Sequence, residues 1–167
     1  MSATLGDILL VMLGDRPASA YELRQRHAEA LGAAHRLDVR RVEVALVRLQ
    51  RVGHVYTDQV LSHGAKRVWS ITEAGRHRQR SWIVDVGPEE AVEDLVARVL
   101  IALAATDRAT FEAVVESCLT RFEGRRPRVA RRAGVTTPAE ARSAFDTEVA
   151  KATLRWLQQL RTHDRVA

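Results

Sequence analysis

Three arginines, Arg40, Arg41 and Arg48, fall on one face of a helix that the sequence predicts from about residue 38 to residue 53. The opposite face carries most of the segment's apolar residues, so the guanidinium groups are expected to point outward. A guanidinium group donates two parallel hydrogen bonds, which suit a guanine edge or a phosphate. The pattern indicates a helix that enters the major groove of a duplex; the alternative is a row of solvated surface arginines.

Two more residues of this outer face, Glu43 and Val44, belong to the predicted contact surface. Glu43 has two interpretations. Its carboxylate is able to accept a hydrogen bond from a cytosine amino group, or it forms an ion pair within the helix with Arg40 or Arg51. We favour the intrahelical pair.

A second basic site is predicted at a β-hairpin whose strands run from 55 to 61 and from 66 to 71. Lys66 and Arg67 lie at its tip, where contact with phosphate or the minor groove is expected. A charged hairpin tip without a ligand is the alternative. Tyr21, at the start of an earlier predicted helix, either reaches a phosphate through its hydroxyl or is a half-buried core residue.

The charge is distributed unevenly along the chain. The net charge is +5 over 167 residues, and residues 1–83 hold 13 Lys or Arg against 8 Asp or Glu, whereas residues 84–167 hold 13 of each. A local cationic excess points to a polyanionic partner, although a chance imbalance in an arginine-rich chain is the alternative.

Other classes of function find no support in the sequence. The six histidines show no i,i+4 pair or HExxH spacing, and neither a phosphate-binding glycine loop nor a nucleophile elbow is present. We expect no enzyme activity, no metal and no cofactor. The N-terminus lacks a secretory pattern, no apolar stretch is long enough for a membrane span, and there is one cysteine, so a cytoplasmic location is expected.

Capping residues and glycine stops bound the predicted helices of the N-terminal half. A first helix, from Leu5 to Leu13, carries a single apolar stripe. The later boundaries are a Ser19–Glu22 capping box, Gly32, an Asp38 cap, Gly53, and a Thr72 cap for a helix that reaches about Ile83.

The segment around residues 84–88 is the predicted boundary between two domains, 1–83 and 84–167. A helix is expected to begin at Pro88, with Asp94 and Arg98 as an ordinary surface pair and an apolar stretch at 95–105. Asp107 is expected to cap the next helix, and Thr137 with Glu140 a long last one. No prediction covers residues 125–136. The stripe of the last helix is Ala141, Phe145, Val149, Ala152, Trp156 and Leu160.

The N-terminal half resembles the PadR-type transcriptional regulators over roughly residues 5–83. The residues that carry the resemblance are Leu9, Val11-Met12-Leu13, Pro17, Tyr21-Glu22-Leu23, Ala45-Leu46, Arg48-Leu49, Gly53 and the run from Arg67 to Arg76. Ala20 stands where the family usually has glycine. Glu43 stands where the family has an aromatic residue near the DNA, so the base-contacting side chains differ from the family's pattern.

The resemblance implies a mainly α fold with a small β-hairpin wing: a winged helix-turn-helix domain followed by an all-α dimerisation arm. It also implies a homodimer that binds a pseudo-palindromic operator in double-stranded DNA, with repression as the default. Apolar surface on residues 95–105 and on the last helix motivates the dimer. The alternative function is a winged-helix protein-interaction module without an operator.

The tryptophans and the single cysteine have regulatory or structural interpretations. Flat hydrophobic effectors of similar regulators bind near aromatic residues between subunits, so Trp82 and Trp156 are candidates for an effector site, with structural packing as the alternative. Cys118 lies on an apolar stripe and is expected to be a buried small hydrophobe rather than a redox sensor. Trp69 is expected to pack inside the hairpin.

Overall fold

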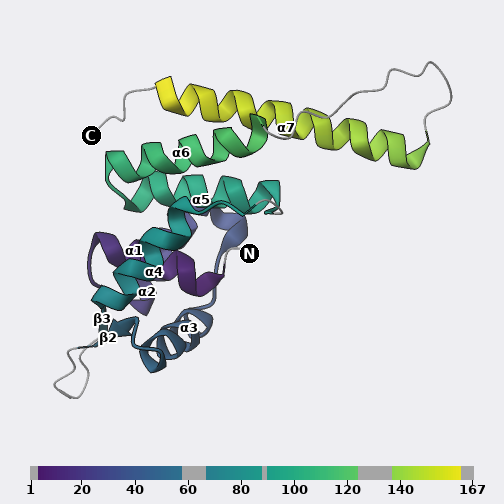
Figure 1. Cartoon of the computed structure of the whole chain (residues 1–167). Coiled ribbons are helices and arrows are strands. Elements are labelled where there is room, and N and C mark those ends of the chain that lie inside the picture. Colours follow the sequence, from purple (N-terminus) through teal and green to yellow (C-terminus); the bar gives the residue numbers. More distant parts are fainter. Residues whose placement is uncertain (1–3, 58–66, 88–89, 124–136, 163–167) are drawn as a thin grey trace.

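The structure, a computed structural model, describes residues 4–57, 67–87, 90–123 and 137–162. Within these ranges it is mainly helical with a small antiparallel sheet (Figure 1), as the sequence predicts. The elements are α1 (Leu5–Asp15), β1 (Ala18–Ser19), α2 (Ala20–Leu31), a 3-10 turn η1 (Ala33–His35), α3 (Val39–Arg51), β2 (Val55–Tyr56), β3 (Val68–Ile71), α4 (Glu73–Val84), α5 (Val92–Ala105), α6 (Arg108–Glu123) and α7 (Pro138–Thr162).

Helix α1 is the centre of the N-terminal core. Every residue from Asp7 to Leu13 is buried, because α2, α3, α4, α5 and β3 all pack around this helix. The predicted single stripe is therefore wrong: a stripe would serve a helix covered on one side, whereas α1 is covered on nearly all sides.

The predicted caps are confirmed at five helix starts. The Ser19 hydroxyl accepts a hydrogen bond from the amide of Glu22, whose side chain accepts from the Ser19 amide, which completes the capping box. Asp38 caps α3 by accepting from the Arg40 amide at 3.0 Å, and Thr72 caps α4 through the Gly75 amide. Asp107 accepts from the Thr110 amide at 2.8 Å. The fifth is the capping box of α7, in which the Glu140 amide donates to the Thr137 hydroxyl and the Thr137 amide donates to the Glu140 carboxylate. Each cap satisfies an amide that lacks a partner within its helix.

The sheet has three antiparallel strands in the order β1-β3-β2. The hairpin predicted between residues 55 and 71 is present, with Val55 opposite Ile71 and Tyr56 opposite Ser70. Its tip, which includes Lys66, lies outside the described residues. The sequence did not predict β1, in which Ala18 pairs with Trp69. As expected, Trp69 is buried.

The root of the hairpin is held tightly against α4. The Thr72 hydroxyl donates to the carbonyl oxygen of Gly53 at 2.7 Å, and its amide donates to the carbonyl oxygen of His54 at 3.0 Å. Gly75 lies against the same turn, where a Cβ would stand 2.1 Å from the His54 carbonyl oxygen. These contacts fix α4 and the hairpin relative to the end of α3.

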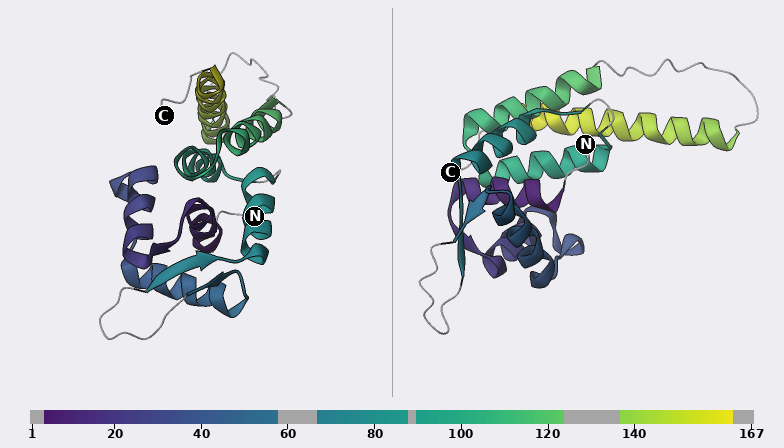
Figure 2. Two further views of the ribbon diagram at one scale, coloured as in Figure 1. Left: turned by 90° about the vertical axis from the view of Figure 1, so that its left-hand side faces the viewer. Right: turned by 60° about the horizontal axis from the view of Figure 1, so that its bottom comes forward.

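Helices α5, α6 and α7 form successive layers on the N-terminal part, and α3 with the strands lies at the end remote from α7 (Figures 1 and 2). Helix α5 packs on α1 and α2 on one side and on α6 and α7 on the other. Leu95, Val99, Ile101 and Ala102 are buried within the chain, whereas Val96, Leu100 and Leu103 are half-buried and Ala104 is exposed. Most of the apolar surface predicted for residues 95–105 is therefore covered by the chain's own helices, and a part of it stays open.

Two further predictions for this region are wrong: the start of α5 and the partner of Arg98. Helix α5 begins at Val92 rather than Pro88, and its cap, Ala91, makes no side-chain cap bond. Arg98 does not form a surface pair with Asp94. It is 1% exposed and pairs with the fully buried Glu90, with 2.5 Å between the guanidinium nitrogen and the carboxylate oxygen.

The apolar stripe predicted for α7 is only partly covered. The buried residues of this helix are Thr147, Thr153 and Leu157. Val149, Trp156 and Leu160 are half-buried, while Ala141 and Ala152 are exposed and Phe145 is 62% exposed. Within one chain, α7 therefore uses a face rotated away from the predicted stripe.

Candidate functional site

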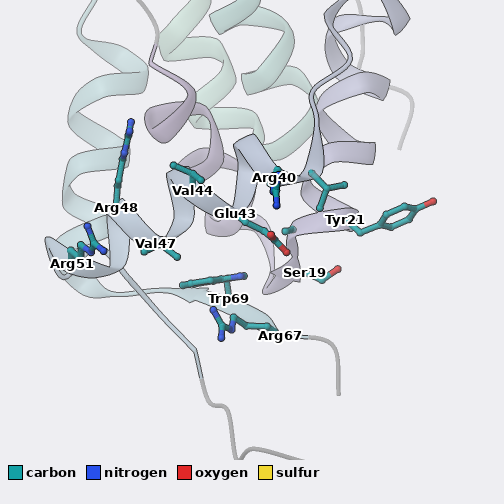
Figure 3. Close-up of a pocket in the computed structure, with 12 residues that line it drawn as sticks. Ser19, Tyr21, Arg40, Glu43, Val44, Val47, Arg48, Arg51, Arg67 and Trp69 are labelled. Carbon is teal, nitrogen blue, oxygen red and sulfur yellow. The ribbon is translucent and has the colours of Figure 1, made fainter. Parts of the chain in front are cut away.

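A groove of about 990 Å³ runs between α3, the start of α2 and strand β3 (Figure 3). It brings together six of the residues singled out in the sequence, and Arg51, Val47, Ser19, Ala20, Val39 and Trp69 complete its lining. The six are Tyr21, Arg40, Glu43, Val44, Arg48 and Arg67. Residues from three separate segments thus converge on one surface.

A second groove lies on the other flank of α3, against the start of α1. Its lining includes Arg41, and it shares Arg40, Val44 and Arg48 with the first groove. Helix α3 is therefore a ridge with a hollow on each side, and the shared residues lie along its crest. The two grooves together are called the α3 surface below.

The arginines of α3 have no acidic partner, in contrast to Arg98, Arg108, Arg142 and Arg161 among the described residues of the C-terminal half. Within the described part of the chain, Arg40, Arg41, Arg48 and Arg51 make no ion pair, and all four are exposed. Several other arginines are paired: Arg78 with Asp7, Arg98 with Glu90, Arg108 with Glu112, Arg142 with Asp146 and Arg161 with Glu116. Arg36, Arg76, Arg80 and Arg155 are also exposed without an ion pair among the described residues, but none of them lines the α3 surface. A surface whose positive charges have no counterion within the protein attracts an anionic ligand.

Glu43 does not form the intrahelical pair that we favoured from the sequence. Its exposed carboxylate has neither an ion pair nor a hydrogen bond with the described residues, although Arg40 and Arg51 line the same groove. Figure 3 shows its side chain extending from α3 into the space beside Ser19 and Trp69.

Two aromatic rings mark the sides of the first groove. Tyr21 is 52% exposed, which excludes the core role considered from the sequence, and the Arg24 guanidinium lies 4.9 Å from its ring centre. The Arg67 guanidinium lies 5.6 Å from the ring of buried Trp69, which anchors the start of β3 (Figure 3). Lys66 lies outside the described residues, so its predicted contact stays a prediction.

Buried side chains fix the position of α3 beneath its charged crest. Val42 and Leu46 are 0% exposed, and α3 packs on α1, α2 and β2. Val39, Ala45 and Leu49 are partly covered, whereas Val52, predicted to face inward, is 63% exposed. Val52 follows the last residue of the helix, where the chain turns away into Gly53.

The two tryptophans proposed for an effector do not lie on the α3 surface. Trp82 is 5% exposed, and the guanidinium of Arg98 covers its ring at 4.3 Å. Trp156 is half-buried on α7. A role for either in effector binding stays a prediction.

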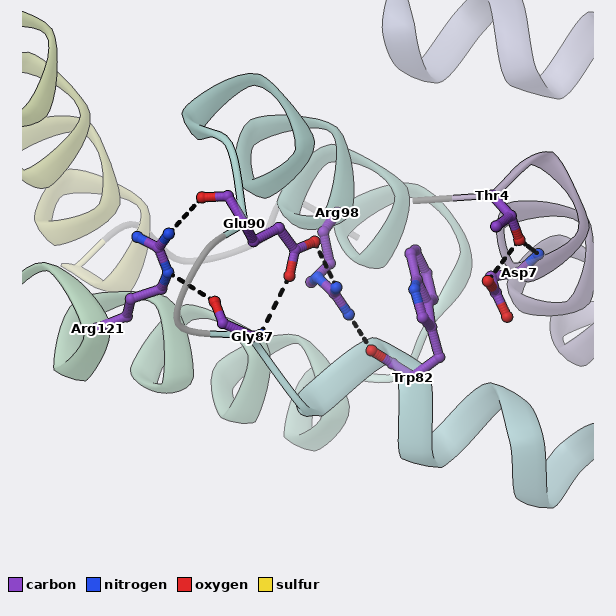
Figure 4. Close-up of polar contacts among 7 residues, drawn as sticks. All are labelled: Thr4, Asp7, Trp82, Gly87, Glu90, Arg98 and Arg121. Atoms are coloured by element: carbon purple, nitrogen blue, oxygen red, sulfur yellow. Dashed lines mark hydrogen bonds and ion pairs between the residues drawn. The ribbon is translucent and has the colours of Figure 1, made fainter. Parts of the chain in front are cut away.

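Arg98 is the centre of a buried polar network at the join between α4 and α5 (Figure 4). It donates to the carbonyl oxygen of Trp82 and to Glu90, whose other carboxylate oxygen accepts from the Gly87 amide at 3.2 Å. Arg121 of α6 donates to the carbonyl oxygens of Gly87 and Glu90. The network ties the end of α4 to both α5 and α6, and so links the part that carries the α3 surface to the C-terminal helices.

Other chemistries have no counterpart in the described ranges. No group of three or more His, Cys, Asp or Glu there is placed to hold a metal ion, and none of the helices described is long and apolar enough to cross a membrane. Cys118 is buried, and burial raises the pKa of its thiol to about 11, which keeps it protonated and unreactive.

Arg51, Val47 and Ser19 belong to the groove but were not among the residues selected from the sequence. Arg51 was identifiable, because it follows Arg48 by three residues on the same outer face. Ser19 was not, since its place depends on the pairing of β1 with β3.

No protein-family model matches the chain, and comparison with curated protein sequences found no match. Among solved structures, Bacillus subtilis PadR in complex with operator DNA matches at 15% identity and a TM-score of 0.46, over 95% of this chain and 98% of that one. The structure of smu.1604c from Streptococcus mutans UA159 matches at 20% identity and a TM-score of 0.40, over 96% of this chain and 100% of that one.

Proposed function

We propose that this chain is a sequence-specific, double-stranded-DNA-binding transcriptional regulator that acts as a homodimer on a pseudo-palindromic operator, with repression as its default action. The observation that carries the proposal is the α3 surface: a helix with four exposed arginines that lack acidic partners, two of them on its crest and one in each of the flanking hollows. The B-DNA major groove is wide enough to admit an α-helix.

In this proposal α3 enters the major groove. Arg40 and Arg48 lie on the crest that both hollows share, where guanidinium groups meet guanine edges or phosphates. Val44 is 49% exposed between them, and a short apolar side chain in that position suits the methyl group of thymine. The hollows on either side accommodate the two sugar-phosphate backbones that border the groove.

Tyr21 and the β2–β3 hairpin contact the backbone beside α3. The Tyr21 hydroxyl, at the start of α2, is exposed on the rim of the first groove and donates to a phosphate. Arg67 lies immediately before β3 on the opposite rim, and Lys66 precedes it in sequence. Contacts of this kind set orientation and affinity rather than sequence preference.

The homodimer would form through α7. The first residues of this 25-residue helix, from Pro138 to Asp146, are all exposed, and Phe145 is the most exposed large apolar side chain of the C-terminal helices. A second copy of α7 would cover the stripe that the single chain leaves open. An effector that binds near Trp82 or Trp156 would act by changing the distance between the two α3 surfaces of the dimer.

The salt dependence of binding tests the proposal. The full chain is titrated with duplexes recovered from a randomised library, at salt concentrations from 50 to 200 mM, roughly the range over which several phosphate contacts cost orders of magnitude in affinity. Wild type should lose affinity steeply. Arg48→Ala should bind more weakly with a shallower slope, and Arg80→Ala, which removes an exposed arginine outside both grooves, should match wild type.

Negligible duplex binding at low salt, with no sequence enriched from the library, would overturn the proposal. It would favour the alternative class, a winged-helix module that binds proteins.

A further inference from the structure

Glu43 is an anion in a groove whose other charged side chains are all arginines: Arg40, Arg48, Arg51 and Arg67. Its carboxylate is exposed and takes part in no ion pair or hydrogen bond with the described residues. The side chain extends from α3 into the groove (Figure 3). The carboxylate is therefore available to a ligand that enters the groove.

An unpaired carboxylate restricts which chemical groups the ligand can place against it. It is repelled by phosphate, and when ionised it only accepts hydrogen bonds. In the major groove, guanine offers the acceptors N7 and O6 and thymine the acceptor O4, so each repels a carboxylate placed against it. Cytosine N4 and adenine N6 are the donors.

The two donors are not equivalent for a carboxylate. Adenine N6 stands beside the acceptor N7, which would face the second carboxylate oxygen. Cytosine presents its amino group without an acceptor on the same major-groove edge. Glu43 should consequently discriminate in favour of cytosine and against the three other bases.

We infer that Glu43 is a specificity-determining residue, whose carboxylate accepts a hydrogen bond from the N4 amino group of one cytosine in each half-site. The inference rests on the proposed function. It also assigns Glu43 a role opposite to that of the arginines, because the carboxylate lowers affinity for any duplex that lacks this cytosine.

The first experiment selects duplexes from a randomised library with the full chain in four forms. Wild type should enrich cytosine at one position of each half-site. Glu43→Gln should shift this position towards adenine, since an amide bonds to N6 and N7 together, and Glu43→Ala should leave it without preference. Glu112→Gln removes the same charge from exposed Glu112 on α6 and should retain the cytosine.

The second experiment removes a single amino group from the DNA. The selected cytosine is replaced by pyrimidin-2-one, which lacks N4. Wild type should lose roughly 5- to 150-fold in affinity, the range for one good base contact. Glu43→Ala should bind the two duplexes equally.

The outcomes separate the inference from the function on which it rests. If wild type enriches an operator and both Glu43 variants enrich the same one, the inference is overturned while the proposed function stands. If wild type enriches no sequence, the proposed function fails and the inference fails with it.

Discussion

At the scale of single residues, the chain uses arginine in two opposite ways. Arg40 and Arg48 project from α3 without acidic partners, whereas Arg98 is buried with its guanidinium bound to Glu90 and Trp82. A buried charge is tolerated only when its partner and hydrogen bonds replace water. Exposed arginines contribute little to folding, so the α3 surface can change while the fold remains.

Arg98→Met should destabilise the protein by about 3–5 kcal/mol, because it leaves Glu90 charged, buried and unpaired. Urea unfolding followed by circular dichroism measures the change. The double variant Glu90→Leu/Arg98→Met should recover part of the loss. Arg108→Met breaks the exposed pair with Glu112 and should cost at most about 1 kcal/mol; an equal loss in both single variants would contradict the network's structural role.

His27 should make stability depend on pH. Burial first, and then the charge of His35, lower its pKa below the ordinary 6.5, so the folded chain binds this proton less readily than the unfolded chain. The corresponding stability is present above pH 6.5 and is lost as pH falls through that value towards the folded pKa. In urea titrations, His27→Gln should flatten the decline below pH 6.5, while His77→Gln, at an exposed position, should leave it unchanged.

At the scale of elements, the sequence predicts those features that depend only on residues close together in the chain. Ser19, Asp38 and Thr72 cap their helices as predicted, because a cap needs only residues within one turn. The pair of Glu90 with Arg98 was missed because Glu90 precedes the helix, and the helical spacing rule favoured Asp94. Strand β1 was missed because a two-residue strand exists only through its pairing with β3.

The residues of the candidate site were predictable from the sequence, but the interactions between their side chains were not. Helical periodicity alone placed Arg40, Arg41, Glu43 and Arg48 outward, and the structure agrees. Whether Glu43 turns to Arg40 or into the groove depends on side-chain geometry that periodicity does not determine. For α7, periodicity identified the apolar stripe, but the folded chain covers a different face of the helix.

Gly75→Ala should destabilise the junction of α4 and the hairpin by about 1–3 kcal/mol, since the new Cβ would stand 2.1 Å from the backbone oxygen of His54. Weaker duplex binding should accompany the loss, because this junction sets the hairpin beside α3. Gly14→Ala is the control: its Cβ would meet only the flexible end of Gln79. Thermal unfolding that is equal for both variants would argue against a rigid junction.

At the scale of the whole molecule, the α3 surface and α7 lie at opposite ends (Figure 1). Between them α5 packs on both parts, and the Arg98 network joins α4 to α5 and α6. A displacement of the C-terminal helices would therefore reach the end that carries the α3 surface through packed helices rather than through a loose linker. This arrangement suits a dimer in which α7 sets the separation of two α3 surfaces.

Phe145→Asp should convert the proposed homodimer to a monomer without unfolding the chain, because Phe145 is 62% exposed in the single chain. Sedimentation at micromolar concentration measures the change. Ala144→Asp, on the charged face of α7 with Glu148, Lys151 and Arg155, should remain dimeric. A monomeric wild type at this concentration would contradict the dimer.

The most direct test of the account is a photo-crosslink from the crest of α3. A photo-reactive residue replaces Val44 in the full chain, or Ala104, which is exposed on α5 and lines neither groove of the α3 surface. Irradiation with a selected duplex is expected to crosslink the chain to DNA from position 44 and not from position 104. Crosslinking from position 104 alone, or from neither position while the duplex is bound, would contradict the proposed role of α3.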